Sequence, residues 1–193
     1  MKLKNRYFLL RHGENVYQVK KRGLIYPLKD NNSIKLTQEG KSQVKKSLKK
    51  IKKEKVDFIY SSDFYRTKES AEIASNELNV KRINLDKRLR DVNMGVFHGR
   101  KKEEYYKFFG YKKRKFSKKP PKGESWDDLK KRMTGFLKNI DKKHKNKKIL
   151  IVSHGDPLWM LEGIIKGMTN RELLNEIFLK KNFIKVGELR KIN

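Results

Sequence analysis

The stretch Tyr7-Phe8-Leu9-Leu10-Arg11-His12-Gly13-Glu14 organises the fold and the chemistry of this chain. The apolar run from Tyr7 to Leu10 predicts a buried strand, which ends abruptly in a cation, an imidazole and a glycine. Arginine offers a planar fork of donors that matches phosphate oxygens, and neutral histidine is a nucleophile at nitrogen. Gly13 lets the backbone turn sharply and approach a ligand. A strand that ends in polar residues without any function would show the same pattern. The choice between these two interpretations therefore depends on other parts of the chain.

A second turn of the same kind follows the apolar run 149–152. It reads Ser153-His154-Gly155, and two of the four histidines in the chain therefore stand in matching strand-end turns before a glycine. The interpretation that these histidines are buried only for packing does not account for this arrangement. Arg66 falls in the first turn of a predicted helix, where the helix N-terminus favours anions. For Arg66 alone, a solvated surface arginine is the competing interpretation.

Hydrophobic periodicity places strands and helices alternately along the chain. Strands are expected at 56–60, 80–85, 149–152 and 183–189, and helices at 37–53, 64–78, 103–109, 125–143 and 171–180. The second helix should be capped by Ser61-Ser62-Asp63, and another should begin with Asp156 as cap and Pro157 at its first position. Residues 15–36 and 111–122 look like loops, and 86–100 have no clear period.

This alternation predicts one α/β domain over residues 1–193. We expect a three-layer sandwich with a mostly parallel central sheet and helices on both faces. Ligands in such folds bind beyond the carboxyl ends of the strands. The turns that carry Arg11, His12, Arg66 and His154 should therefore converge on one site.

The composition narrows the class of protein. The 193 residues are 36% hydrophobic and 10% aromatic, which is enough for a folded core. The absence of cysteine excludes disulfides and thiolate metal sites. The first six residues are too polar for a signal peptide, and no apolar run approaches the length of a membrane span. We expect a cytoplasmic protein without a membrane partner.

The formal net charge of +29 is extreme. Clustered cations bind nucleic acid by releasing its counterions, so a nucleic-acid partner is one interpretation. The Lys-Lys pairs are spread along the chain, however, and Asn and Ile are abundant beside them, as AT-rich coding would produce. We favour coding bias, with steering of an anionic substrate as a third interpretation.

Six blocks of sequence, taken together, resemble the histidine phosphatase superfamily, the phosphoglycerate mutase-like group. The blocks run in the family's order and cover 11–14, 36–40, 61–71, 89–99, 121–125 and 152–155. The resemblance implies that His12 attacks phosphorus and becomes a phosphohistidine. It implies that Arg11, Arg66 and a protonated His154 hold the phosphoryl oxygens. No metal or cofactor is then needed, because these cations neutralise the charge.

The resemblance also assigns a proton donor and substrate contacts. Asp91 takes the place of the family's usual Glu as general acid and base; it is one methylene shorter, and Glu14 is the alternative. Asn15, Gln18 and Arg66 are the expected substrate-binding residues, and Gln18 stands where the family often has Asn.

The expected function is hydrolysis of a phosphomonoester of a small phosphorylated metabolite. Phosphoglycerate mutase-type transfer is the first alternative. The second is an RNA- or protein-binding module, motivated by the charge. Residues 153–161 and 182–189 are also similar to a phosphatase-like domain inserted in some bacterial isoleucyl-tRNA synthetases.

Overall fold

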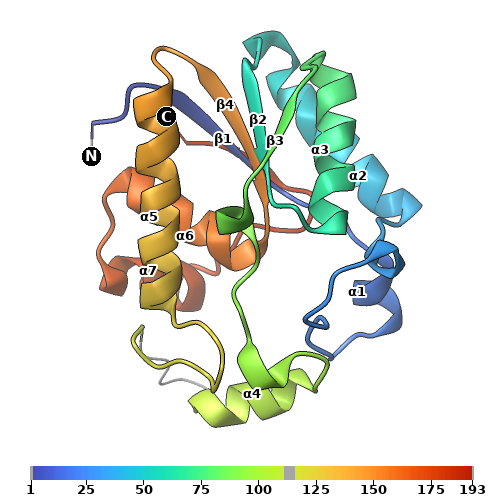
Figure 1. Cartoon of the computed structure of the whole chain (residues 1–193), viewed down its shortest axis with the longest axis vertical. Helices are drawn as coiled ribbons and strands as arrows, with labels where there is room; N and C mark the ends of the chain where they lie inside the picture. Colours follow the sequence, from blue (N-terminus) through green and yellow to red (C-terminus); the bar gives the residue numbers. More distant parts are fainter. Residues whose placement is uncertain (1, 111–115, 193) are drawn as a thin grey trace.

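In the computed structural model, which describes residues 2–110 and 116–192, the expected α/β architecture is confirmed. The described chain contains a five-stranded sheet in the order β3-β2-β4-β1-β5 (Figure 1). The first four strands in the sequence are parallel to their neighbours, and only β5 is antiparallel, against β1. The strands are β1 Arg6–Arg11, β2 Phe58–Ser61, β3 Ile83–Leu85, β4 Lys148–Ser153 and β5 Leu189–Lys191.

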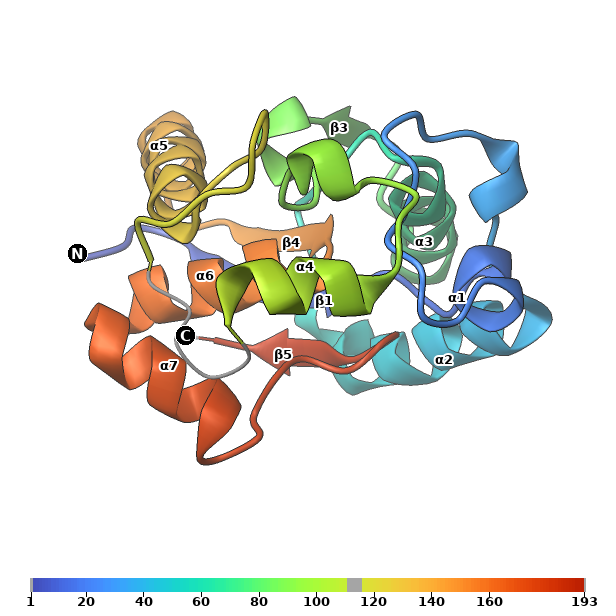
Figure 2. The same ribbon diagram turned by 90° about the horizontal axis from the view of Figure 1, so that it is seen from below.

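Side chains that alternate along β1 build two separate cores, because successive strand residues point to opposite faces. Tyr7 and Leu9 pack with α5 Trp126–Lys143 and α6 Gly155–Lys166, beside α7 Asn170–Phe178. Phe8 and Leu10 pack with α2 Gln38–Leu48 and α3 Tyr65–Leu78. Figure 2 shows these two groups of helices on opposite sides of the sheet. The three layers expected from the sequence are therefore present.

A third, smaller apolar cluster lies beyond the carboxyl ends of the parallel strands. It contains Ile25, Phe97, Tyr105 and Phe109, and it supports α4 Lys102–Phe109, which crosses the lower side of the molecule in Figure 1. The backbone N–H of Ile25 donates to the carbonyl of Arg100 at 2.8 Å. Two segments far apart in sequence thus form one covering layer over the end of the sheet.

The expected loop 15–36 contains a short helix, α1 Val16–Lys20, and a 3₁₀ turn, Asn32–Ile34. Asn15 and Gln18 close a capping box at the start of α1, an arrangement that satisfies otherwise unpaired backbone groups. The expected loop at 111–122 lies partly outside the described residues, at 111–115.

Two helices begin at other residues than predicted. Helix α3 starts after Phe64, which makes no side-chain cap bond. Ser62 Oγ accepts from the N–H of Phe64 and also lies 3.0 Å from His154 Nε2, while Asp63 pairs with Arg90. Helix α6 starts at Gly155, after His154, so Asp156 is not its cap. Pro157 fits the third position because the first turn of a helix does not use its N–H groups.

The last strand was misplaced. β5 begins at Leu189, and residues 183–188 are irregular. Gly187 has φ +68°, which interrupts an extended run. The carbonyl of Ile184 accepts from the Arg11 guanidinium instead of a neighbouring strand.

Candidate active site

The two histidine turns lie side by side because β1 and β4 are neighbouring parallel strands. Their register pairs Arg11 with Ser153, so His12 and His154 follow at the same edge of the sheet. The backbone N–H of His12 donates to the carbonyl of Ser153 at 3.1 Å, and the centroids of the two imidazole rings are 5.3 Å apart. Both rings are buried. The convergence expected from the sequence is present for these two residues.

The protonation state of His12 follows from its hydrogen bond and its surroundings. Nδ1 lies 2.8 Å from the carbonyl oxygen of Gly13, and a carbonyl can only accept, so Nδ1 carries the proton. Burial, followed by the charges of Arg66 and Arg11, holds the pKa of His12 well below its usual 6.5. The ring is therefore neutral at pH 7, and its Nε2 keeps a lone pair.

His154 presents a buried donor to the same site. Its Nε2 lies 3.0 Å from the Ser62 hydroxyl, which already accepts from the backbone N–H of Phe64 and can donate to the ring. Nδ1 then carries the proton, and it has no hydrogen-bond partner among the residues the structure describes. Burial, then Arg66 and His12, lower the pKa of His154 well below 6.5. Without a bound anion, the protonated form expected from the sequence is therefore disfavoured.

Arg66 comes from the first turn of α3, as predicted, but it is not a surface residue. Its side chain is 1% exposed. The guanidinium carbon lies 4.1 Å from the centre of the Tyr26 ring, and Nη1 pairs with Asp30 at 3.2 Å. Nε is buried and has no partner in the described part of the chain. A buried cation is costly unless paired; Asp30 and Asp91 pair with this one, and the buried Nε keeps an N–H that an anion could accept.

Arg11 completes the cationic part of the site. Its Nη1 donates to the carbonyl of Ile184 at 2.8 Å, and its guanidinium lies 5.6 Å from the centre of the Phe183 ring. Nε is buried without a partner among residues 2–110 and 116–192. Burial lowers the pKa of Arg11, with Asp91 opposing that shift.

Of the two acidic candidates, Asp91 faces the histidines and Glu14 does not. Asp91 Oδ2 is 3.4 Å from Arg66 Nη2 and 3.8 Å from His154 Nδ1. Glu14 Oε1 instead accepts from the Thr37 hydroxyl at 2.8 Å, at the start of α2. The geometry thus places the shorter carboxylate within reach of the phosphate-binding groups.

A cavity of about 680 Å³ lies beside these residues. Arg11, Arg66 and Asp91 line it, whereas the buried His12 and His154 do not. Its wall is formed by segments from α1 to Leu28, by 87–98 and by α4, which Figure 2 shows across the end of the sheet. Lysines, arginines and tyrosines are common in this wall (Tyr17, Lys21, Arg22, Tyr26, Lys87, Arg90, Lys102, Tyr106).

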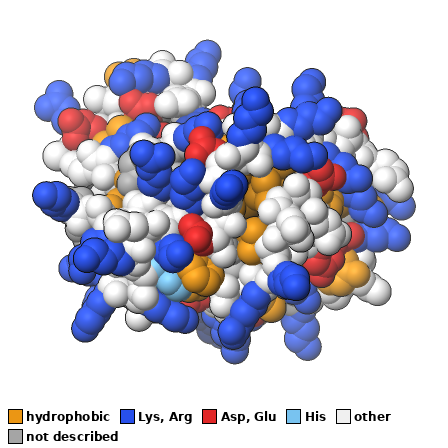
Figure 3. Space-filling model, turned by 90° about the horizontal axis from the view of Figure 1, so that it is seen from above, with side chains coloured by type: hydrophobic (Ala, Val, Ile, Leu, Met, Phe, Trp, Pro, Cys, Tyr) orange, Lys and Arg blue, Asp and Glu red, His pale blue; other side chains and the backbone are white. Residues whose placement is uncertain are grey.

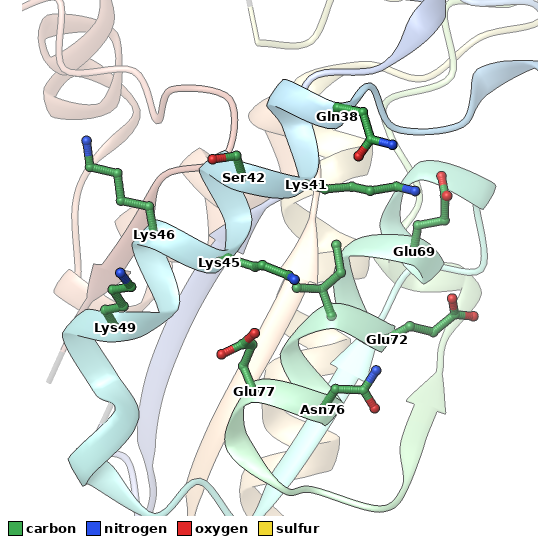
Figure 4. A pocket seen from close by; sticks show the side chains of 11 residues that line it. Gln38, Lys41, Ser42, Lys45, Lys46, Lys49, Glu69, Glu72, Asn76 and Glu77 are labelled. Atoms are coloured by element: carbon green, nitrogen blue, oxygen red, sulfur yellow. The ribbon is translucent and has the colours of Figure 1, made fainter.

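A second hollow, of about 820 Å³, lies elsewhere, between α2 and α3. In Figure 4, Lys41 and Lys45 extend from α2 toward α3, which carries Glu69, Glu72 and Glu77. It is lined by neither histidine nor arginine, so it shares no residue with the site described above.

Comparison with known proteins identifies the family. Residues 7–180 match the sequence profile of the histidine phosphatase superfamily, branch 1.

The chain belongs to the histidine phosphatase superfamily.

Relatives of this histidine phosphatase carry several names. A probable phosphoglycerate mutase, GpmB, from Photorhabdus laumondii is 31% identical over 170 residues, which are 83% of this chain and 74% of that protein. Phosphoserine phosphatase 1 from Hydrogenobacter thermophilus is 30% identical over 157 residues, 78% and 71% of the two chains. Among solved structures, YhfR from Bacillus stearothermophilus has a TM-score of 0.72 and 26% identity, covering 88% of this chain and 83% of that one. The alpha-ribazole phosphatase from Shigella flexneri has a TM-score of 0.76 at 19% identity, covering 95% and 88%, and supports the fold alone.

Two expected substrate-binding residues of this histidine phosphatase have a local structural role. Asn15 is fully buried, and its side-chain amide donates to Gln18 Oε1 at 2.9 Å and to the Tyr26 hydroxyl at 2.8 Å. Gln18 lines the cavity, but the same oxygen also accepts from the backbone N–H of Asn15. Substrate contact by these two residues stays a prediction.

Sequence reasoning missed two polar partners of the site, Tyr26 and Asp30. Ser62 stands in a strand-end turn that was expected to converge with the histidine turns, although its contact with His154 was not predicted. Tyr26 and Asp30 lie in a segment with no periodicity, and their contacts with Arg66 span 40 and 36 residues. No local signal marks them.

Among residues 2–110 and 116–192, no group of three or more His, Asp or Glu side chains lies close enough together to hold a metal ion. Within the same residues, no helix is both long and apolar enough to cross a membrane.

Proposed function

We propose that this histidine phosphatase hydrolyses phosphomonoesters through a phosphohistidine at His12. One observation carries the proposal. A neutral imidazole, anchored through Nδ1, lies among three buried side chains that keep an unpartnered N–H within the described chain: Arg11, Arg66 and His154. A phosphoryl group bound over His12 Nε2 would accept from these donors.

The reaction then has two steps. In the first, the His12 Nε2 lone pair forms a bond to phosphorus and the P–O bond to the leaving group breaks. The leaving oxygen takes the electron pair and a proton from Asp91. In the second, water forms a bond to phosphorus while Asp91 takes its proton, the P–N bond breaks, His12 Nε2 recovers its lone pair, and inorganic phosphate departs. Arg11, Arg66 and His154 stabilise the charge on the three equatorial oxygens in both steps.

The substrate we propose is a small phosphorylated metabolite. A cavity of about 680 Å³ is within the range of small-molecule sites, and its charged wall suits an anion. Phosphoserine phosphatase 1 and the solved phosphoserine phosphatase of Entamoeba histolytica, 25% identical with a TM-score of 0.69, are named for such a substrate. A cytoplasmic location stays a prediction.

A nucleic-acid partner has less support than a small anion. Figure 3 shows the face opposite the cavity, where Lys and Arg are spread widely with Asp and Glu between them. Nucleic acid is usually bound by cations clustered in a patch or stripe. This face therefore adds nothing to the net charge in support of the RNA-binding alternative.

Rapid quenching with labelled substrate tests the proposed intermediate. A panel of phosphoesters, including p-nitrophenyl phosphate, is first used to find a substrate for the wild type. The wild type should then accumulate an acid-labile, base-stable phosphoenzyme, and His12→Ala should form none. His144→Gln is the control, because His144 packs against Phe58 and binds Tyr60, away from the cavity. Full hydrolysis by His12→Ala would refute the proposal.

Phosphoglycerate mutase activity is the second candidate, favoured by the 31% identity to the GpmB protein. In that case the phosphoryl group would pass from His12 back to a glycerate oxygen instead of to water. Interconversion of 2- and 3-phosphoglycerate faster than phosphate release would establish it.

A further inference from the structure

The loop that carries Asp91 has little regular structure of its own. It lies between two 3₁₀ turns, Lys87–Leu89 and Gly95–Phe97. In Asp91 itself, Oδ1 accepts from the neighbouring backbone N–H of Val92 at 3.1 Å. Such a bond sets the local turn, but it does not fix the loop relative to the histidines.

Two contacts supply that connection. The Ser153 hydroxyl donates to the carbonyl of Leu89 at 2.6 Å, and Arg132, on α5 and at the cavity wall, binds carbonyls on either side of Leu89. Its Nη2 donates to the backbone carbonyl of Asp91 at 3.2 Å, and its Nη1 donates to the carbonyl of Arg88. One guanidinium therefore binds two backbone carbonyls of the loop, that of Asp91 and that of Arg88 three residues earlier. The helix beneath is anchored in the main core through Met133 and Phe136.

Glu124 holds Arg132 and the same loop together. Its carboxylate accepts from Arg132 Nε at 2.6 Å and from Nη2 at 2.8 Å. Its backbone N–H donates to the carbonyl of Asn93 at 2.8 Å, and its Oε2 accepts from the Asn93 N–H at 3.3 Å. The side chains of Arg132 and Glu124 are 21% and 13% exposed. This two-point ion pair is therefore partly shielded from water and geometrically well defined.

We propose that Arg132, held by Glu124, is a positioning residue that sets the Asp91 carboxyl at the distance needed for proton transfer. The inference rests on the proposed function, in which Asp91 is the general acid. Asp91 Oδ2 lies 3.4 Å from Arg66 and 3.8 Å from His154, and a short side chain cannot recover these distances if the loop moves. A displacement of about 1 Å costs on the order of 10²-fold in rate.

The test compares leaving groups in single-turnover experiments. Release of phenol from phenyl phosphate needs a proton, whereas p-nitrophenolate leaves from p-nitrophenyl phosphate without one. Arg132→Gln should slow release from phenyl phosphate by about 10²-fold and release from p-nitrophenyl phosphate by no more than about threefold. Binding of inorganic phosphate, measured by calorimetry, should stay within about twofold of wild type, because Arg11 and Arg66 are unchanged.

Two further variants separate positioning from charge and from general loss of stability. Arg132→Lys keeps the charge but cannot donate to four acceptors at once, so it should show most of the same defect. Arg88→Gln is the matched control: its side chain pairs with Asp86 and does not line the cavity, and both substrates should react at wild-type rates.

The outcomes are distinct. Equal losses with both substrates, or no loss with either, would overturn the positioning role. Full rescue by Arg132→Lys would replace it with an effect of charge. If the wild type forms no phosphohistidine, the proposed function itself has failed. If Arg132→Gln melts below the assay temperature, Glu124→Gln replaces it in the test, because its backbone N–H still donates to the carbonyl of Asn93. Glu124→Gln should also slow release from phenyl phosphate far more than release from p-nitrophenyl phosphate. Equal effects on the two substrates would refute the proposal.

Discussion

Replacement of Gly13 by alanine should disable the histidine turn through a steric conflict. A Cβ added at Gly13 would lie 2.2 Å from the backbone oxygen of Gly40, and one added at Gly40 would lie 2.0 Å from the oxygen of Glu14. Gly13 is not among the glycines with positive φ. The glycine is thus needed for close contact with α2, not for the sharp turn that the sequence suggested.

The size of the effect follows from these distances. The Cβ and the Gly40 oxygen must separate by at least about 0.8 Å to reach 3.0 Å, and both are attached to backbone. Gly13 accepts from His12 Nδ1 at 2.8 Å and donates to Ser70 Oγ at 3.2 Å, so its shift moves the nucleophile. We expect about 10²-fold slower phosphorylation of His12 and a loss of about 1–3 kcal/mol of stability.

Gly135→Ala is the control, because a Cβ there meets nothing within 4 Å on the exposed side of α5. It should add about 1 kcal/mol of stability through helix propensity and leave the rate unchanged. The assays are single-turnover release from p-nitrophenyl phosphate and thermal unfolding, where each kcal/mol shifts Tm by about 2–4 °C. A Gly13→Ala protein with the wild-type rate and Tm would refute the reasoning.

Three further predictions concern the charged groups of the site. Arg66→Ala should lower kcat/KM by about 10²–10³-fold through loss of one transition-state donor; a change below about tenfold would place the arginine outside the reaction. Asp91→Asn should slow phenyl phosphate far more than p-nitrophenyl phosphate, whereas Glu14→Gln should change both rates little; the reverse pattern would make Glu14 the acid. Burial lowers the pKa of His12 and His154 in the folded state. The part of the free energy of unfolding that depends on their neutral forms is therefore fully present above about pH 6.5, the usual pKa of histidine, and is lost as the pH falls below it. The loss is at most about 1.4 kcal/mol per pH unit for each. Urea unfolding between pH 7.5 and 5 measures this slope, which the double substitution by Asn should flatten; an unchanged slope would contradict it.

The sheet and the histidine turns could be predicted because their signals are local. The apolar run 7–10 and the similar run at 149–152 indicate strands by composition and length alone. Parallel strands bring their carboxyl ends to one edge of the sheet, so the turns after these runs were expected to converge. The pairing of β1 with β4, which makes His12 and His154 neighbours, comes from the structure alone.

The helix starts and the last strand could not be predicted from local signals of this kind. Ser62 and Asp63 are good caps in isolation, but in the folded protein they bind His154 and Arg90. The contact of Ser62 is buried, and an unpaired buried group costs more than an uncapped helix end. Asp63 instead forms a two-point ion pair with the half-exposed Arg90. Local propensity therefore failed where the active site required the same residues.

The sequence by itself determined the α/β fold and the family, since these depend on periodicity and on short motifs in a set order, and it nominated the reacting groups that we propose. Only the tertiary structure decided which carboxylate faces the histidines: Glu14 is next to His12 along the chain yet binds Thr37, while Asp91, far away in sequence, lies 3.8 Å from His154. The tertiary structure also brought Asp30 to Arg66 and Arg132 to the Asp91 loop. Contacts between distant segments depend on how helices and loops pack against the sheet, and no local pattern in the sequence encodes those distances.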